Sequence, residues 1–217
     1  MRLSILLVAV LLAGCDTTVD PPPQPPQERE PATFRVTLDA TWSAETHPDA
    51  FPPNPHFSRL TGAVHAPRVA LWANGAFASD GIREMAETGA TARLRIEVET
   101  FSPDATFIEG GPIRTSPGTA TVEITASEGR PFVTLVSMLA PSPDWFVGVS
   151  SLDLRDGGGW ADRVEVPLEV YDAGTDDGDS YTAPDSPSAA PSPVTTSFYA
   201  PLVGTTVGTL IFERVGE

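Results

Sequence analysis

Two aspartate-bearing corners carry the residues of this sequence that are best suited to chemistry. Residues 141–145 read Pro-Ser-Pro-Asp-Trp, and residues 172–179 contain four aspartates around two glycines. Between them, residues 163–170 alternate polar and apolar side chains, which predicts a β-strand. Carboxylate oxygens suit Ca²⁺, which takes about six to eight oxygen ligands. The pattern therefore predicts a hard-cation site, and only tertiary folding can join Asp144 to Asp172, 28 positions further on.

Other roles for these aspartates are available. Asp144 follows two prolines, so it could instead cap backbone amides in a turn. The second corner is not an EF-hand loop, which needs Gly at its sixth position and Glu at its twelfth. Counting from Asp172, those positions hold Asp177 and Ala183. We expect Asp177 and Asp179 to be solvated neighbours of the site.

The same stretch resembles the spondin domain family. The resemblance covers roughly residues 33–215, and we assign residues 33–217 to one spondin-like domain. It implies a C2-like antiparallel β-sandwich that acts as a binding or adhesion module. It also implies one bound Ca²⁺, with Asp144, Asp172 and Asp176 as side-chain ligands. The matching positions are residues 141–145, Val147-Gly148, Leu152 to Leu154, Trp160, Asp172 to Asp176 and Gly178, with weaker matches at Trp42-Ser43, His47-Pro48, Phe51-Pro52, His56 to Ser58, Gly62, His65, Leu71-Trp72 and Gly75.

The first residues indicate export. An apolar run from Leu3 to Leu12 follows Arg2; it is too short to span a bilayer but has the length of a secretory signal. Its end, Leu-Ala-Gly-Cys at residues 12–15, resembles the lipobox of bacterial lipoproteins. We therefore expect residues 1–14 to be removed and Cys15 to be acylated, which would anchor the protein in the bacterial cell envelope, on the periplasmic face or the cell surface. An ordinary signal peptide is the alternative, disfavoured because Cys15 is the only cysteine.

Composition excludes several functions. Six of the eleven residues from 21 to 31 are proline, so residues 15–32 are predicted to form a semi-rigid tether. The net charge of −16 repels phosphate backbones, and we expect no nucleic-acid partner. All 13 basic residues are arginine, which excludes a Schiff-base lysine. With Cys15 lipidated, the folded domain has no disulfide and no catalytic thiol.

The expected fold is all-β, a sandwich of about eight strands with one short helix. The helix is predicted over residues 80–88, with Ser79 or Asp80 as its N-cap and Gly89 closing it. Residues 47–60 and 183–196 are predicted loops, the second wrapping the surface. The expected strands are residues 34–38, 68–73, 92–98, 120–126, 132–139, 146–154, 164–170 and 203–215, with 132–139 buried on both faces.

Other chemistry finds less support. His47, His56 and His65 recur at a spacing of nine, which matches no usual zinc geometry, so we expect structural hydrogen bonds. No G-x-S-x-G nucleophile motif is present. Trp160 is expected in the core, whereas Trp145 could be core or a carbohydrate platform. We therefore expect a non-enzymatic module that binds an envelope or extracellular protein or glycan. The alternatives are a hydrolase of envelope glycans that uses Asp144 or Asp172, and a periplasmic scaffold.

Overall fold

A computed structural model describes residues 29–216. The predicted signal segment, Cys15 and most of the predicted tether lie outside these residues. Twelve strands are described, eight of at least five residues and four of two residues. The elements are β1 (Ala32–Ala40), β2 (His56–His65), α1 (Asp80–Thr88), α2 (Ala92–Glu99), β3 (Ala105–Ile113), β4 (Gly118–Ala126), β5 (Phe132–Ala140), β6 (Trp145–Asp153), β7 (Arg155–Asp156), β8 (Gly159–Trp160), β9 (Arg163–Pro167), β10 (Tyr171–Asp172), β11 (Thr195–Thr196), the 3₁₀-helix η1 (Ala200–Leu202) and β12 (Gly208–Val215).

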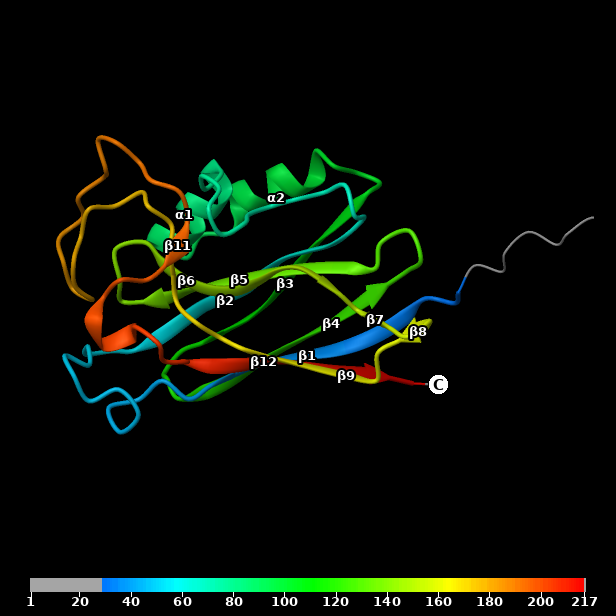
Figure 1. Ribbon diagram of the computed structural model, residues 1–217, viewed down its shortest axis with the longest axis horizontal. Helices are drawn as coiled ribbons and strands as arrows, with labels where there is room; N and C mark the ends of the chain where they lie inside the picture. The colour runs from blue at the N-terminus through cyan, green and yellow to red at the C-terminus, as the bar shows by residue number, and fades with distance from the viewer. Residues whose placement is uncertain (1–28, 217) are drawn as a thin grey trace, which may run out of the picture.

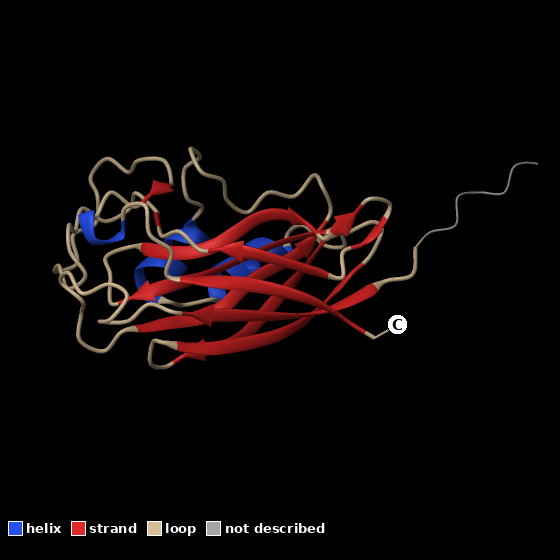
Figure 2. Ribbon diagram, turned by 60° about the horizontal axis from the view of Figure 1, so that its bottom comes forward, coloured by secondary structure: helices blue, strands red, loops and turns tan. Residues whose placement is uncertain are grey.

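Two antiparallel sheets face each other, as the family resemblance implies (Figures 1 and 2). The first sheet has the strand order β4-β1-β12-β9, and the second has the order β11-β10-β6-β5-β2-β3. The strands β7 and β8 form a separate small ribbon. The prediction of an all-β sandwich is confirmed.

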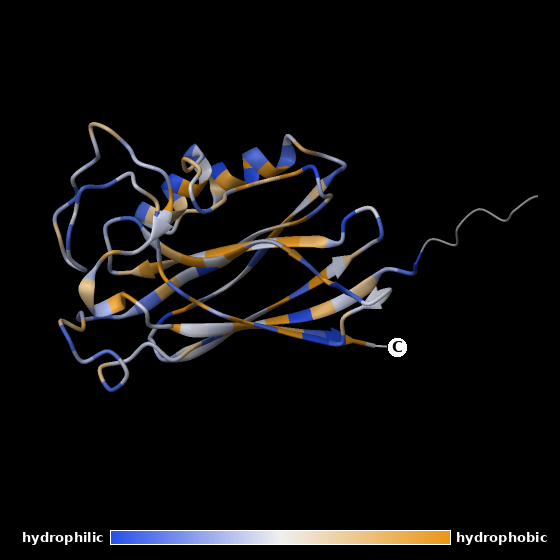
Figure 3. Ribbon diagram, in the orientation of Figure 1, coloured by the Kyte–Doolittle hydropathy of each residue, from blue (hydrophilic) through white to orange (hydrophobic). Residues whose placement is uncertain are grey.

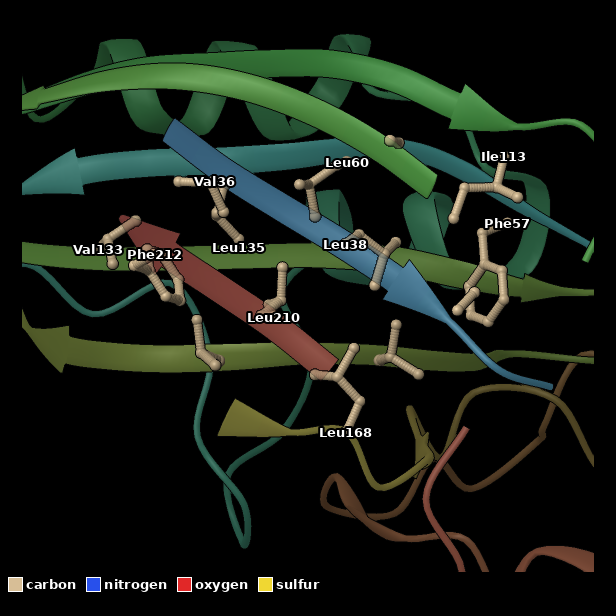
Figure 4. Packing of buried hydrophobic residues seen from close by; sticks show 14 of the residues in the cluster. Val36, Leu38, Phe57, Leu60, Ile113, Val133, Leu135, Leu168, Leu210 and Phe212 are labelled. Atoms are coloured by element: carbon tan, nitrogen blue, oxygen red, sulfur yellow. The ribbon is translucent and has the colours of Figure 1, made fainter. Parts of the chain in front are cut away.

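The inner faces of the sheets form one core. Phe34, Val36 and Leu38 of β1 are fully buried, and the residues between them are partly or fully exposed. They pack beside Leu210 of the neighbouring strand β12 and meet Leu135 of β5, which lies in the opposite sheet (Figure 4). Burial of each such side chain contributes about 1.5–3 kcal/mol, so the period-two pattern of β1 is enough to fix its face.

The central strand β5 is buried on both sides, as its nearly continuous apolar sequence predicts (Figure 3). Val133 and Leu135 point into the core between the sheets, whereas Val136 and Met138 belong to a second cluster. That second cluster lies under the helices and includes Ile82 and Met85 of α1. The helices therefore cover the outer face of the second sheet.

Helix α1 has the predicted bounds and caps. The hydroxyl oxygen of Ser79 accepts a hydrogen bond from the amide of Ile82 at 3.2 Å. Gly89 ends the helix in the left-handed conformation, with φ of 71°, and its amide donates to the carbonyl of Met85. This region of backbone conformation is costly for residues with a Cβ atom.

The predicted strand over residues 92–98 is wrong, because this segment forms the second helix α2. Leu94 and Val98, four residues apart, are fully buried, whereas Ile96 between them is 64% exposed. The sequence Ala-Arg-Leu-Arg-Ile-Glu-Val-Glu alternates, but several of its residues are good helix formers. Glu97 also accepts hydrogen bonds from the amide of Gly81 and the hydroxyl of Ser79 at 2.7 Å, which fixes α2 against the start of α1.

The predicted strand over residues 68–73 is also wrong. These residues form a loop, which begins with a turn in which the Val69 amide donates to the Ala66 carbonyl. Several boundaries differ as well. β2 begins at His56, inside the predicted loop of residues 47–60, and β3 was not predicted. The last strand begins at Gly208 and not at residue 203, because residues 203–204 form a turn after η1. Neither α-helix in the described residues is long and apolar enough to cross a lipid bilayer.

The segment from β9 to β10 changes sheets. β9 pairs with β12 of the first sheet, and β10 pairs with β6 of the second. This crossing carries Asp172 to the end of the sandwich that holds the β5–β6 turn and η1, here called the distal pole. Figure 1 shows that β1 begins and β12 ends at the opposite end.

Candidate metal centre

The two aspartate-bearing corners meet at the distal pole. The first corner is the turn between β5 and β6, where the Ser142 hydroxyl donates to the Leu139 carbonyl at 2.5 Å and accepts from the Trp145 amide at 3.1 Å. The second corner follows β10. Asp172 lies opposite Trp145 in the β10–β6 pair, and the amide of Ala173 donates to the carbonyl of Asp144 at 3.1 Å. Sheet pairing therefore joins the two corners that the sequence separates.

Asp144 is the centre of this arrangement and has no exposed surface. Its Oδ2 accepts hydrogen bonds from the amides of Thr175 at 2.7 Å and Asp176 at 3.1 Å, and from the Thr175 hydroxyl at 3.2 Å. Its Oδ1 is buried and has no hydrogen-bond partner among the described residues. Burial, and next the charge of Asp172, raise the pKa of Asp144 to about 6, although the hydrogen bonds oppose the shift.

Asp172 is held by the two corners together. Its Oδ1 accepts from the amide of Gly174 at 2.8 Å, and its Oδ2 accepts from the indole nitrogen of Trp145 at 3.2 Å. Burial raises the pKa of Asp172, and the charge of Asp176 adds to that increase. The charge of Asp172 therefore acts on Asp144, and that of Asp176 acts on Asp172. This repulsion favours either protons or a cation.

Asp176 is buried and joins the site to the loop of residues 183–196. Its two carboxylate oxygens accept hydrogen bonds from the amides of Gly178 and Ser186, each at 2.8 Å. The amide of Asp177 donates to the Ser186 carbonyl, and the amide of Ser188 donates to the Thr175 carbonyl. The prediction that this loop wraps the surface is confirmed. No sequence pattern indicated that one of its amides would reach Asp176.

The donor set suits a hard cation. A buried carboxylate oxygen without a partner is costly unless something pairs with it, and Asp144 Oδ1 is such an atom. Ca²⁺ accepts oxygen ligands in flexible geometry, and Asp172 lies beside Asp144. The three carboxylates do not form a ready-made triad: no group of three His, Cys, Asp or Glu side chains in the described part of the chain has a metal-holding arrangement.

Aromatic rings support the site from the core side. Trp145 is 2% exposed, and its ring packs 4.9 Å from that of Tyr199 and 5.5 Å from that of Tyr181. This burial excludes Trp145 as a carbohydrate platform. Trp160 is half-buried against the core at the other end of the sandwich, where its indole nitrogen donates to the Glu30 carbonyl.

The three histidines have structural partners, as predicted. His47 bonds the hydroxyls of Thr46 and Thr205, at 2.9 and 3.2 Å. His56 bonds the Asn54 carbonyl at 2.8 Å. His65 is fully buried and bonds the Ala66 carbonyl and the Thr134 hydroxyl, both at 2.9 Å. They do not converge within the described residues, so the zinc alternative gains no support.

The fold and the site define a two-sheet antiparallel β-sandwich domain with an acidic pole, and comparison with known proteins specifies the family. The family model described as Spondin_N matches residues 32–200. The chain is 32% identical to human Spondin-2 over 189 residues, which cover 78% of this chain and 57% of the relative. It is 33% identical to chicken Spondin-1 over 169 residues, or 72% of this chain and 21% of the relative.

Human Spondin-1 is 31% identical over 209 residues, which cover 86% of this chain and 26% of that protein. The chain belongs to the spondin family. It matches just over half of the length of Spondin-2 and about a quarter or less of the length of Spondin-1.

Proposed function

We propose that this protein is an exported, membrane-anchored binding module whose distal pole is organised by one Ca²⁺ ion. The observation that carries the proposal is the fully buried Asp144, whose Oδ1 has no partner in the described residues and whose neighbour Asp172 is also a carboxylate. A cation would satisfy the buried oxygen and offset the repulsion between the two groups.

The residues that would hold the ion are Asp144, Asp172 and Asp176. Asp144 would offer Oδ1, because its Oδ2 is already fixed by amides of the second corner. Each carboxylate oxygen of Asp172 accepts one hydrogen bond and keeps a further lone pair. The ion would supply positive charge between loops that sheet pairing already brings together, so its effect would be structural, with backbone carbonyls or water completing the shell.

Calorimetry and thermal melting test the ion. The mature protein, stripped with chelator, should bind one Ca²⁺ and melt at a higher temperature as calcium increases, because a ligand that binds only the folded state stabilises it. Mg²⁺ should substitute poorly, since it demands tighter octahedral geometry. Absence of calcium heat, together with a melting temperature that ignores both calcium and chelator, would reject the ion.

The membrane anchor is proposed from residues 12–15, with Cys15 carrying the lipid. Figure 1 shows that β1 starts at the end opposite the distal pole, so a tether entering there would leave the aspartates facing away from the membrane. Mass spectrometry of the mature N-terminus, with a Cys15→Ala variant as the control, tests the anchor. Acylated Cys15 in the native protein and loss of membrane association in the variant are expected; an unmodified terminus beyond Cys15 would refute it.

The binding role is proposed from membership of the spondin family, with an extracellular or envelope protein or glycan as the partner. Immobilised mature protein should capture a partner from native envelope, and capture should fall with chelator. Asp172→Asn, which removes one carboxylate charge, is the matched control. If both proteins retain a partner equally, with and without calcium, partner binding does not depend on the proposed ion.

A glycan hydrolase is the less favoured candidate. Asp144 has no exposed surface, and a general acid or base must reach the substrate directly or through one water. Both carboxylates also hold backbone or indole hydrogen-bond donors of the two corners. Hydrolytic activity on envelope glycans that survives chelation but is lost in Asp172→Asn would reverse this choice.

A further inference from the structure

We propose that a small pocket beside the aspartates binds an arginine side chain of a partner protein. The pocket lies between the β9–β10 crossing and the segment of residues 196–205, and Phe198, Val203 and Glu169 line it. The proposal rests on the binding role proposed above and names the chemistry of the partner. It does not depend on bound calcium.

Two large apolar side chains are exposed at this pocket. Phe198 is 80% exposed and Val203 is 57% exposed. Isolated exposed apolar residues are ordinary on protein surfaces, but these two line one hollow of about 150 Å³. That volume suits a single side chain, whereas it is well below the several hundred cubic ångströms of a pocket for a drug-sized ligand.

The backbone on both sides of these residues is fixed. The amide of Ser197 donates to the Val170 carbonyl at 2.8 Å, and the ring of Tyr199 packs on Trp145. Leu202, which precedes Val203, is buried, and its amide donates a hydrogen bond to the Tyr199 carbonyl at 2.8 Å. Phe198 and Val203 are therefore presented by anchored segments, and a partner that contacts them would lose little free energy to ordering the loop.

Glu169 gives the pocket its negative charge. It is exposed, and its carboxylate forms no ion pair or hydrogen bond with any described residue. The arginine nearest to it in sequence, Arg163, already pairs with Glu165 and Glu213. The chain has no lysine, and residues 3–28 contain no basic residue. No described arginine pairs with Glu169, so the carboxylate is available to a cationic side chain of another molecule, and the net charge of −16 favours the approach of such a group.

Arginine fits this combination better than other side chains. Its planar guanidinium can stack on the Phe198 ring while donating to the Glu169 carboxylate. Its methylene groups can contact Val203. A purely apolar side chain would cover the carboxylate without giving it a partner, which is unfavourable. Lysine offers a point charge without the flat face, and we expect it to bind more weakly.

Nuclear magnetic resonance with a minimal probe tests the pocket. Acetyl-Gly-Gly-Arg-Gly-Gly-amide should shift the backbone amides of residues 196–205 and of Glu169, with a Kd on the order of millimolar, as expected for one side chain. The same peptide with citrulline, which is neutral and nearly isosteric, should bind about tenfold more weakly. Glu169→Gln should lower the affinity for the arginine peptide by about threefold to tenfold, and Phe198→Ala by a similar factor.

Phe77→Ala is the matched control, because Phe77 is 66% exposed but lies outside this pocket. It should leave the titration unchanged, and dispersed spectra establish that each variant is folded. Equal binding of the arginine and citrulline peptides, shifts confined to other residues, or an unaffected Phe198→Ala variant would overturn the proposal. Titrations in calcium and in chelator distinguish the pocket from the ion. If the arginine peptide binds but the protein does not respond to calcium, the pocket is supported and the ion is rejected. If the protein responds to calcium but the arginine peptide does not bind, only the pocket is rejected.

Discussion

Asp172 lies directly opposite Trp145 in the β10–β6 pair, and the buried indole nitrogen of Trp145 donates to Asp172 Oδ2 at 3.2 Å. Trp145 follows Asp144 in sequence, so one residue connects both halves of the acidic site. Its ring also packs against Tyr199, three residues after the end of β11. Thr195 of β11 pairs with Asp172. The carboxylates and the arginine pocket therefore share one support.

Trp145→Phe should loosen this support without opening a large cavity. The variant keeps an aromatic ring but leaves Asp172 Oδ2 without its indole donor, which should lower the free energy of unfolding by about 1–3 kcal/mol. Calcium affinity should fall as well, because Asp172 would lose its fixed orientation. Chemical denaturation and calorimetry measure the two effects.

Trp160→Phe is the control, since its indole nitrogen donates to the Glu30 carbonyl at a more exposed position. It should change stability by less and leave calcium affinity unaltered. Equal losses of stability in the two variants would mean that the Trp145 bond to Asp172 has no special role.

Asp144→Asn should have opposite effects with and without calcium. Without calcium it removes a buried negative charge while keeping an oxygen that can accept the amides of Thr175 and Asp176, so its stability should equal or exceed that of the unmodified protein. With calcium, the unmodified protein should gain about 2.7 kcal/mol at a hundredfold excess over Kd, a rise in melting temperature of about 5–10 °C.

The variant should gain little from calcium. Melting curves of both proteins, with chelator and with calcium, give all four values. A variant that loses stability in chelator and still responds fully to calcium would contradict this account of Asp144.

The strands of the first sheet could be predicted from sequence because each turns one apolar face to the core. In β1 the alternation of Phe34, Val36 and Leu38 with polar residues leaves one face to bury. The nearly continuous apolar sequence of β5 correctly indicated burial on both faces. Helix α1 was predictable because Ser79 and Gly89 mark its ends with side-chain and backbone chemistry.

The errors arose where tertiary contacts override local pattern. In α2 the alternating sequence is also compatible with a helix. Packing within the second cluster determines that Leu94 and Val98 are the buried pair. Strand β2 carries no strict alternation, since its second half is buried on both faces. The hydrogen bond from the Ser186 amide to Asp176 comes from a separate loop, and no local sequence pattern indicates such a contact.

Helix α2 gives a direct test of this correction. Val98→Asp should prevent folding or lower the free energy of unfolding by several kcal/mol, because it buries a charge in the cluster under α1. Ile96→Asp, two residues away, should change stability by about 0.5 kcal/mol or less, since Ile96 is 64% exposed. In the predicted strand the two residues would share one face and respond alike. Thermal or chemical denaturation therefore distinguishes the helix from the strand.

Calcium-free protein should become less stable as the pH rises through the acid range. The pKa of Asp144 is raised from an ordinary value of 3.8 to about 6 in the folded state. The folded state therefore binds this proton more tightly, and the free energy of unfolding falls between about pH 4 and pH 6 as the proton is lost. A shift of about two pKa units corresponds to about 3 kcal/mol. Asp172, whose pKa is also raised, acts in the same direction.

Buried His65 changes the pH dependence of stability in the opposite direction. The contribution of Asp144 is therefore isolated by comparing the unmodified protein with Asp144→Asn. Burial lowers the pKa of His65 below 6.5, which makes its contribution to stability present at neutral pH and lost as the pH falls. Asp144→Asn retains His65 but cannot titrate at residue 144. The free energy of unfolding of the unmodified protein minus that of the variant, in chelator, should decrease from pH 4 to pH 7 and level off above about pH 6.

Saturating calcium should remove most of that decrease at neutral pH, because the ion replaces the proton. A difference that stays flat across this range in chelator would show that Asp144 titrates normally and would withdraw the electrostatic reason for placing a cation beside it.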